Sequence, residues 1–290
     1  MTLSIIIPTY NSSKFILSCI HSIYVNINFE SYDIIIVDNN SKDNTVGLVN
    51  NKYPKVATLE NGQNFGYSYA VNKGIEQSKS DFICILNPDT IINNDIFMIL
   101  INHLRENKNV GCVGPKILNT DGTFQYSCRR NFPHFRYFAY KFFMLDRKFP
   151  HSNRLNSYNL GTSSVNQILH VNSISGACMV FKRELLNSVG IFDENYFMFW
   201  EDTDFCNRVI DQGYVVAYDN KAEIMHYKGG SRELSNLHLN VIFYESLLYF
   251  FIKHKRKFFP WRYITFIPYF SLCIIIYLLK INYFISEKLS

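Results

Sequence analysis

Residues 3–40, LSIIIPTYNSSKFILSCIHSIYVNINFESYDIIIVDNN, decide the fold class of this chain. Two short apolar runs, at 4–7 and 34–37, are each followed by turn residues, and a helix-like segment at 14–24 separates them. Runs that are apolar at consecutive positions are typical of strands buried on both faces of a parallel sheet. The stretch therefore predicts a strand-helix-strand unit of an open α/β fold.

The same alternation continues to about residue 115 and returns after residue 161. Between these points lies a basic, aromatic segment that suits a lid, an acceptor-binding insertion or a plain surface excursion. The further elements that we expect are strands at 82–86, 110–113, 168–171 and 214–218, and helices at 68–77, 96–107, 183–188 and 201–211. No internal repeat or low-complexity linker interrupts them.

The composition excludes a disordered chain, because 48% of the 290 residues are hydrophobic and only 18% are charged. The 20 Tyr and 25 Phe residues predict an aromatic-rich surface that meets a membrane or an amphipathic ligand. The seven cysteines are scattered and form no CxxC pair, which favours reduced thiols in a cytosolic protein. The N-terminus has no basic leader and too short an apolar run for a signal peptide, so we do not expect secretion.

The net charge of +5 comes with two basic, aromatic stretches, at 129–148 and 253–262. No nucleic-acid-binding pattern accompanies them, so we expect an anionic membrane surface as partner and no nucleic acid. Residues 263–279 form an uncharged run of 17, the short limit for a membrane span, and Pro268 interrupts it. We expect a single span or an interfacial helix, and a helix packed on its own domain is the alternative. If the run spans, the positive-inside rule leaves the main domain in the cytosol.

Two expected strands deliver an acid to the same edge of the sheet, because ligands of open α/β sheets bind beyond the carboxyl ends of the strands. Asp38 follows the second strand, and Asp89 stands in NPDT after the strand at 82–86. Such acids can bind a nucleotide and a Mg²⁺ or Mn²⁺ ion, or they can simply begin turns and helices. Neither GxGxxG nor GxxxxGK[ST] is present, so phosphate is expected to meet a metal and side chains.

The stretch FMFWEDTDFCNR, residues 197–208, places three acids in four positions. At 100° per residue Asp202 falls on the apolar face of the expected helix. The residues on the opposite face are Glu201, Asp204, Asn207, Arg208 and Asp211. We expect Asp204 and Arg208 to form a solvated ion pair. Helical geometry leaves Asp202 open between a general base and an N-terminal cap.

His226 in IMHYKGGSR is a structural histidine or a ligand. Its neighbours include Lys228 and Arg232, which could receive a diphosphate together with the two glycines between them. The stretch NGQNFGYSYAVNKGI adds Gly66 and Gly74 around a short helix, where backbone could approach a ligand.

Together these pieces resemble the inverting glycosyltransferases of family 2, particularly the bacterial rhamnosyltransferase-like branch. The resemblance covers residues 2–250 and is carried by motifs in the expected order. They are SIIIPTYN, IIIVDNNSKDNT, NFGYSYAVNKGI, LNPDT, GPKILNTDGTFQYSCRRNFP, GACMVFKRELLNSVGIFDENYFMFWEDTDFCNRVIDQGY and MHYKGGSR. It implies a GT-A fold, Rossmann-like with a mostly parallel sheet, in residues 1–250. We expect a nucleotide-binding half at 1–115, an acceptor and catalytic half at 116–250, and a membrane-associating tail at 251–290.

The resemblance also implies roles for single residues. Thr9 and Asp38 would contact the nucleotide, and Asn64 and Gly66 would line the donor site. Asp89 would bind the divalent metal, in a motif that many relatives write as DxD and that here begins with Asn87. His226 would complete the metal shell or contact the diphosphate, and Asp202 matches the family's catalytic base. Lys228 or Arg232 would stabilise the departing nucleoside diphosphate.

The implied reaction is a hexosyltransferase-type single displacement with inversion of the anomeric carbon. We expect a metal-dependent enzyme, with Mg²⁺ or Mn²⁺, that moves L-rhamnose from dTDP-L-rhamnose to a lipid-linked glycan of bacterial surface polysaccharide, such as O-antigen or capsule. It would work at the cytoplasmic face of the inner membrane. The alternatives are a UDP-hexose or UDP-galactofuranose donor, and a non-catalytic sugar-nucleotide-binding scaffold.

Overall fold

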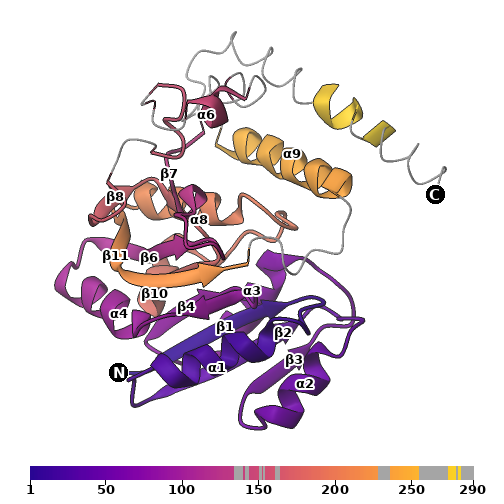
Figure 1. Cartoon of the computed structure of the whole chain (residues 1–290), viewed down its shortest axis with the longest axis vertical. Helices are drawn as coiled ribbons and strands as arrows, with labels where there is room; N and C mark the ends of the chain where they lie inside the picture. Colours follow the sequence, from indigo (N-terminus) through magenta and orange to yellow (C-terminus); the bar gives the residue numbers. More distant parts are fainter. Residues whose placement is uncertain are drawn as a thin grey trace.

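A computed structural model describes residues 1–133, 140, 144–149, 152, 154–160, 164–227, 236–254, 274–278 and 280–281. Its centre is a mixed sheet flanked by helices (Figure 1). In spatial order the strands are β3 (Ala57–Glu60), β2 (Tyr32–Asp38), β1 (Leu3–Thr9), β4 (Phe82–Leu86), β10 (Cys178–Lys182), β6 (Val110–Leu118), β11 (Val215–His226) and β5 (Thr90–Ile92). β8 (Leu169–Val171) pairs with β11, and β7 (Arg129–Arg130) and β9 (Ser173–Ile174) form a separate small sheet.

The first four strands of the spatial order run parallel, and β10 lies antiparallel between β4 and β6. β11 is parallel to β6, so β1, β4 and β11 all end at the same edge of the sheet. The chain moves outward from β1 to β3 and then returns to β4 on the other side of β1. This reversal is the switch point at which open α/β sheets bind ligands.

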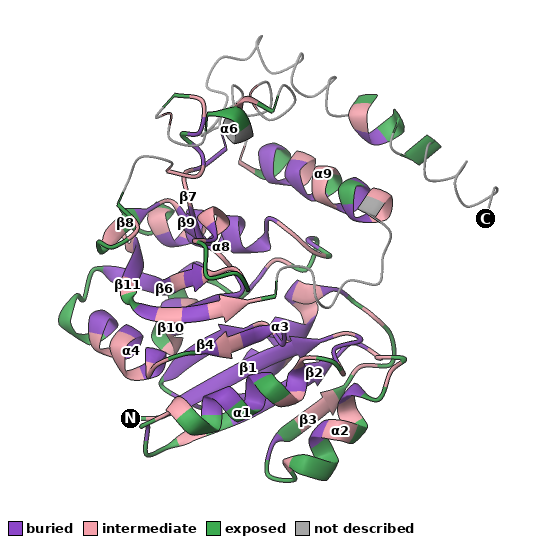
Figure 2. Ribbon diagram, in the orientation of Figure 1, coloured by how far each residue is buried: buried purple, intermediate pink, exposed green. Residues whose placement is uncertain are grey.

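The helices are α1 (Ile16–Asn26), α2 (Thr45–Lys52), α3 (Tyr67–Gln77), α4 (Ile96–Glu106), α6 (Leu145–Lys148), α7 (Leu186–Val189), α8 (Glu201–Asp211) and α9 (Asn236–Lys253). The central strands β1, β2, β4, β10 and β6 form a continuous buried core, largely purple in Figure 2, while β3 at the edge and α2 are largely exposed or half-buried. Ile5, Ile6 and Ile7 all have no exposed surface, as expected for a strand covered on both faces.

A second, aromatic core lies under α9, which is set above the sheet beside α8 in Figure 1. Trp200 packs there against Phe243 and Phe250 of α9, with ring centroids 5.4 and 5.9 Å apart. Part of the abundant aromatic content is therefore buried between α8 and α9 and not presented at a surface. No helix within the described ranges is long and apolar enough to cross a membrane. Residues 263–273 and 279 of the predicted membrane segment lie outside these ranges.

The expected α/β architecture is confirmed, with differences in detail. The sequence patterns missed α2, β3, β10 and α9, and β11 is one long strand bulged between Asp219 and Glu223. The expected helix at 183–188 is a 3₁₀ turn, Arg183–Leu185, that leads into α7. α9 runs across the expected boundary at residue 250, and the division into units stays a prediction.

Candidate active site

Asp38 ends β2 with its carboxylate held by its neighbours and 2% of the residue exposed. Thr9 Oγ1, at the end of the adjacent β1, donates to Asp38 Oδ1 at 2.8 Å. The Ser41 N–H donates to Oδ2 at 2.7 Å, and the Ser41 hydroxyl donates to Oδ1 at 2.5 Å. These three hydrogen bonds orient the carboxylate of Asp38, whose oxygens can accept further from a ligand N–H or hydroxyl.

Gly66 joins this edge to the loop before α8. It has a φ of 94°, and a Cβ added here would collide with the Phe197 carbonyl, so only glycine fits. Its N–H donates to Asn64 Oδ1, and its carbonyl accepts from Asn39 Nδ2, each at 3.0 Å. The next residue, Tyr67, donates its N–H to Phe197 O at 2.7 Å. The predicted donor-site residues Asn64 and Gly66 are thus in contact with each other and with the loop that leads to Asp202.

Asp89, Asn87 and His226 meet at the end of β4, because β11 reaches back to pair with β5 and sets His226 opposite Thr90. His226 Nε2 lies 3.1 Å from Asp89 Oδ1 and 3.5 Å from Asn87 Nδ2. Its other ring nitrogen lies 3.1 Å from Gln125 Oε1. The Oδ1 atoms of Asp89 and Asn87 are buried, and neither has a hydrogen-bond partner among the described residues.

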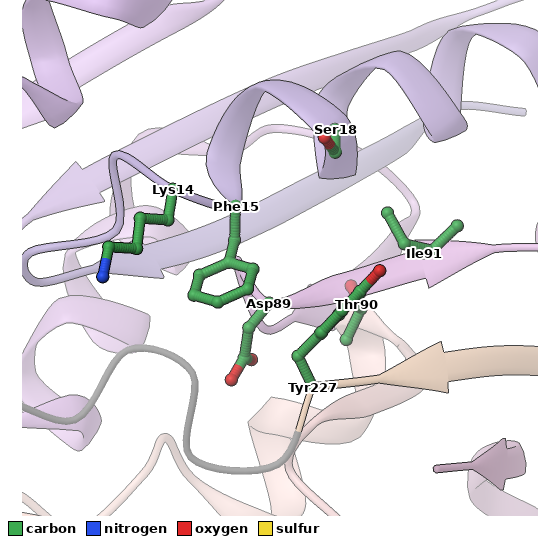
Figure 3. A pocket seen from close by; sticks show the side chains of 7 residues that line it. All are labelled: Lys14, Phe15, Ser18, Asp89, Thr90, Ile91 and Tyr227. Atoms are coloured by element: carbon green, nitrogen blue, oxygen red, sulfur yellow. The ribbon is translucent and has the colours of Figure 1, made fainter. Parts of the chain in front are cut away.

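A pocket of about 230 Å³ opens beside Asp89. It is lined by α1 and the turn before it on one side and by β5 and the end of β11 on the other (Figure 3). The rings of Phe15 and Tyr227 stand 5.3 Å apart at its wall. Lys14 is the cation among its lining residues and is exposed, so the pocket combines a carboxylate, a cation and aromatic walls.

Asp202 lies in the first turn of α8, with 7% of the residue exposed. Its Oδ2 accepts from Arg130 at 2.6 Å and from the Gly176 N–H at 3.0 Å, and its Oδ1 accepts from Thr203 Oγ1 at 3.1 Å. Burial opposes the charged form of Arg130, but attraction to Asp202 outweighs it and raises the pKa of this guanidinium. Asp202 makes no capping bond to the helix, so the cap alternative does not describe its contacts.

The backbone before α8 is strained. Phe199 and Trp200 have φ values of 69° and 68°, in the left-handed region that bulky residues avoid. Each such residue costs about 1–3 kcal/mol and persists where surrounding packing enforces it. Here the aromatic core under α9 holds both rings, and the turn brings Asp202 against Gly176.

Helical geometry predicts Glu201 on the face of the helix opposite the apolar one, and a solvated side chain would be expected there, but it is buried, with 7% of the residue exposed. Its Oε2 has no hydrogen-bond partner in the part of the chain that the structure describes. Burial, and then the neighbouring Asp202 carboxylate, raise the pKa of Glu201 to about 8. At neutral pH this side chain is therefore protonated while Asp202 faces a guanidinium.

We expect Glu201→Gln, which imitates the protonated acid, to remove a pH dependence of stability. The pKa of Glu201 rises from 4.5 to about 8 on folding, so its contribution is complete below pH 4.5 and is lost as pH rises through 8. The variant should exceed the wild type in free energy of unfolding at pH 8.5 by at least about 1.4 kcal/mol, the equivalent of one pKa unit. Urea unfolding from pH 5 to 9 measures this, and an equal offset at every pH would contradict it.

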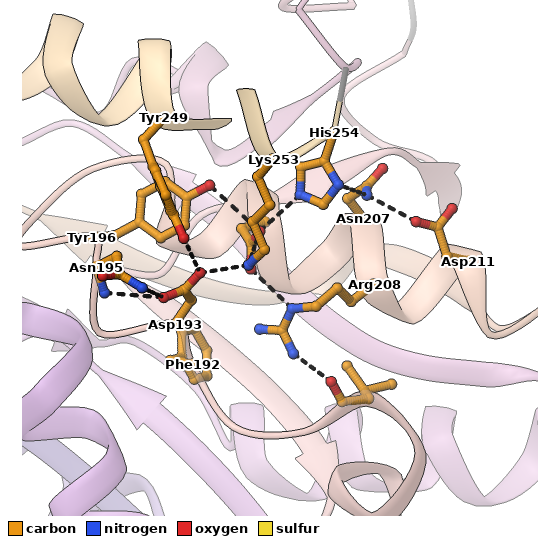
Figure 4. A network of polar contacts seen from close by, with 12 residues as sticks. Phe192, Asp193, Asn195, Tyr196, Asn207, Arg208, Asp211, Tyr249, Lys253 and His254 are labelled. Carbon is orange, nitrogen blue, oxygen red and sulfur yellow. Dashed lines mark hydrogen bonds and ion pairs between the residues drawn. The ribbon is translucent and has the colours of Figure 1, made fainter. Parts of the chain in front are cut away.

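The expectation of a solvated Asp204–Arg208 pair is also wrong. Asp204 has no exposed surface. Its carboxylate oxygens lie 2.9, 2.7 and 2.8 Å from nitrogen atoms of Arg208, Lys253 and His254, the partners labelled in Figure 4. Burial alone would raise the pKa of Asp204, but the His254 hydrogen bond and the Arg208 and Lys253 charges hold it below its usual value. The helical pattern identified a polar face correctly, but the end of α9 covers that face with cations.

The predicted site residues thus fall into three groups along one edge. Thr9 contacts Asp38, Asn64 contacts Gly66, and Asn87 and Asp89 contact His226. Asp202 is linked to the last group through two consecutive residues, since Gly176 bonds Asp202 and Asn87 donates its N–H to Ala177 O at 2.9 Å. Lys228 and Arg232 lie outside the described residues.

Sequence reasoning missed Arg130, Gly176 and Tyr67. Tyr67 donates its hydroxyl to Gly176 O at 2.7 Å, and Gly176 in turn bonds Asp202. Arg130 stood in a segment recognised only as basic, and nothing in the sequence pattern pairs it with Asp202, 72 positions later.

The model of the family described as Glycosyl transferase family 2 matches residues 4–190. N-acetylglucosaminyl-diphospho-decaprenol L-rhamnosyltransferase of Mycobacterium tuberculosis is 28% identical over 68% of this chain and 67% of its own length. Poly-beta-1,6-N-acetyl-D-glucosamine synthase of Staphylococcus aureus is 26% identical over 75% of this chain and 48% of its own length.

Among solved structures, a mannosyltransferase of Pyrobaculum calidifontis in complex with GDP-Man and Mn²⁺ has a TM-score of 0.60 at 17% identity. The match covers 88% of this chain and 64% of the mannosyltransferase chain. GalNAc-T7 with UDP, GalNAc and Mn²⁺ also has a TM-score of 0.60, at 12% identity, over 85% of this chain and 46% of its own. Likeness at these identities shows the fold alone, and it confirms the expected GT-A fold. With the family model matched over most of its length, the chain belongs to glycosyl transferase family 2.

Proposed function

We propose that this glycosyltransferase moves L-rhamnose from dTDP-L-rhamnose to a lipid-linked glycan, inverting the anomeric carbon. The observation that carries the proposal is the short link between Asp89 and Asp202. Gly176 and Ala177 are consecutive, and they bond the Asp202 carboxylate and the Asn87 N–H. A donor held at Asp89 therefore presents its sugar beside an acid that can take a proton from an acceptor hydroxyl.

The residues at the end of β4 fit a divalent cation. Oδ1 of Asp89 and Oδ1 of Asn87 are buried and have no hydrogen-bond partner in the described chain. His226 Nε2 lies 3.1 Å from Asp89 Oδ1, and the amide nitrogen of Asn87 faces the same ring atom at 3.5 Å. Oxygen ligands suit Mg²⁺ and Mn²⁺, and imidazole is a common further ligand. Asn87 supplies one negative charge fewer than an acid would. A bound ion there neutralises the charge that develops on the departing diphosphate. We propose Asp89 and His226, with Asn87, as its ligands.

The other polar residues of this edge recognise the donor and activate the acceptor. Asp38, held by Thr9, accepts from the nucleotide, and the Gly66 turn lets backbone approach the donor without a side chain. Asp202 takes the proton from the acceptor hydroxyl, and the oxygen then attacks the anomeric carbon from the opposite side to the diphosphate. Lys228 and Arg232 remain proposed contacts of the diphosphate.

The choice of donor and acceptor rests on the relative whose printed name is an L-rhamnosyltransferase acting on a diphospho-decaprenol sugar. We propose the same class of substrates for this chain, in the synthesis of a bacterial surface polysaccharide. We also propose that it works at the cytoplasmic face of the inner membrane. The basic, aromatic residues at 253–262 and the uncharged run at 263–279 support attachment to that surface.

A donor panel tests this function. Purified enzyme with a polyprenyl-diphosphate-linked sugar acceptor and Mn²⁺ should release nucleoside diphosphate from dTDP-L-rhamnose at least about tenfold faster than from UDP-hexoses or UDP-galactofuranose, since such a preference is worth about 1.4 kcal/mol. Release without acceptor is the control. Turnover with a UDP-sugar and none with dTDP-L-rhamnose would overturn the rhamnosyl assignment. No transfer from any donor, with donor binding retained, would favour the scaffold.

A further inference from the structure

Arg130 is the one cation that contacts Asp202 in the part of the chain that the structure describes, and it comes from β7, not from α8. β7 pairs antiparallel with β9, which sets Arg130 opposite Ser173. The Arg130 NH2 group donates to Ser173 Oγ and to Ile174 O, each at 3.2 Å, as well as to Asp202. The neighbouring strand β9 therefore helps to hold the Arg130 guanidinium in the position where it contacts Asp202.

The two oxygens of Asp202 are not equivalent. Oδ2 receives two donors anchored outside α8, the Arg130 guanidinium and the Gly176 N–H. Among the described residues, Oδ1 accepts from the hydroxyl of the adjacent Thr203 alone, at 3.1 Å. About a tenth of the Asp202 side chain is exposed, and Oδ1 has the remaining capacity to accept.

Other acids also lie around this carboxylate in the described part of the chain. They are Glu201 of α8, Tyr67 of α3 and Tyr158 of the segment after β7. An acid among other buried acids tends to hold its proton unless a cation or hydrogen-bond donors favour the charged form. Arg130 supplies that charge at a distance of 2.6 Å.

We infer that Arg130 is the positioning residue of the reaction, holding the Asp202 carboxylate turned so that Oδ1 takes the proton. The inference rests on the proposed function. In that step the acceptor O–H bond breaks and its proton passes to Asp202 Oδ1. The acceptor oxygen forms a bond to the anomeric carbon, and the bond from that carbon to the diphosphate oxygen breaks, with its electron pair leaving on the nucleoside diphosphate. Arg130 stays charged throughout and gives up no proton.

Without Arg130, Glu201 and Asp202 would be adjacent buried acids that no cation among the described residues contacts, an environment that disfavours an ionised carboxylate. The base then reaches its reactive form only in more alkaline solution. The acid limb of the pH profile of kcat/KM, which reports the free enzyme, should move upward. A loss of packing alone would lower the profile evenly and leave the limb in place.

The test compares Arg130→Met, Arg130→Lys and a matched control, Arg208→Met. Arg208 also bonds an aspartate of α8, at 2.9 Å, but that acid has Lys253 and His254 as further partners. Arg130→Met should shift the acid limb up by about 1–3 pH units. Arg130→Lys should keep the acid limb within about 0.5 unit but lower kcat about tenfold, because an ammonium on a flexible stem is held less firmly than the planar guanidinium whose one nitrogen contacts Ser173, Ile174 and Asp202. Arg208→Met should leave the limb unchanged.

Donor binding, measured by calorimetry with Mn²⁺, and far-UV circular dichroism accompany each variant. An evenly lowered profile for Arg130→Met, with the wild-type limb, overturns the inference. Should that variant not fold, Arg130→Lys decides, and wild-type kcat in it overturns the positioning role. Absence of transfer by the wild type itself instead overturns the proposed function.

Discussion

Asp202→Asn should lower kcat by about 10²–10⁴-fold, the usual contribution of a general base, while the donor still binds. The amide keeps the volume of the acid, and its oxygen can still accept from Arg130 and the Gly176 N–H. It cannot take a proton from the acceptor hydroxyl. Single-turnover transfer with saturating donor measures the loss, and calorimetry with nucleotide and Mn²⁺ should give a Kd within about threefold of the wild type, which is below 1 kcal/mol.

The control for this variant is Asp211→Asn, at the exposed end of the same helix. It removes one negative charge from α8 without touching the sheet edge, so kcat should change less than about twofold, as for an exposed charge. Full transfer by Asp202→Asn would show that another group accepts the proton. A matching loss in donor affinity would assign Asp202 to donor binding.

Asp89→Asn should lower transfer by about 10²–10³-fold, the scale seen when a group that stabilises developing negative charge is removed. The carboxylate is 4% exposed, and its Oδ1 lacks a hydrogen-bond partner among the described residues. The substitution leaves two neutral amides, at 87 and 89, where a cation prefers charged oxygen. Binding of Mn²⁺ with nucleoside diphosphate, followed by electron paramagnetic resonance, should weaken at least about tenfold, or about 1.4 kcal/mol.

Asp121→Asn is the matched control, because Asp121 is exposed in a turn and bonds only Thr123 among the described residues. Metal removal supports the same conclusion by another route. EDTA should abolish wild-type transfer, and Mg²⁺ or Mn²⁺ should restore it. Activity that survives EDTA, with unchanged Mn²⁺ binding by Asp89→Asn, would remove Asp89 and His226 from the metal role.

The position of Asp38 and Asp89 at one edge of the sheet could be predicted because it follows from local rules. Consecutive apolar residues identify buried strands, and the residues after parallel strands meet at one edge. His226 joins this group because β11 is long enough to reach Thr90 of β5. The register of that pairing cannot be predicted from the sequence of β11 or of β5 alone.

The surroundings of α8 could not be predicted, because they depend on contacts between distant segments. Helical periodicity separates the polar face of α8 from its apolar face, but it does not say what lies against the polar face. Lys253 and His254 reach Asp204 from about fifty positions along the chain, and Arg130 reaches Asp202 from 72 positions before it. α9 itself gave no helical signal, since apolar residues occur all round it and not in one stripe.

Lys253 and His254 attach the end of α9 to Asp204 in the first turn of α8. Asp204 and Asp202, the proposed base, belong to one turn of the same helix, α8. Because Lys253 and His254 contact Asp204, no flexible segment separates the end of α9 from Asp202. Packed side chains and rigid helices transmit displacement between sites. A substitution that removes the Lys253 or His254 contact therefore acts on the same helix whose first turn places Asp202 against Gly176.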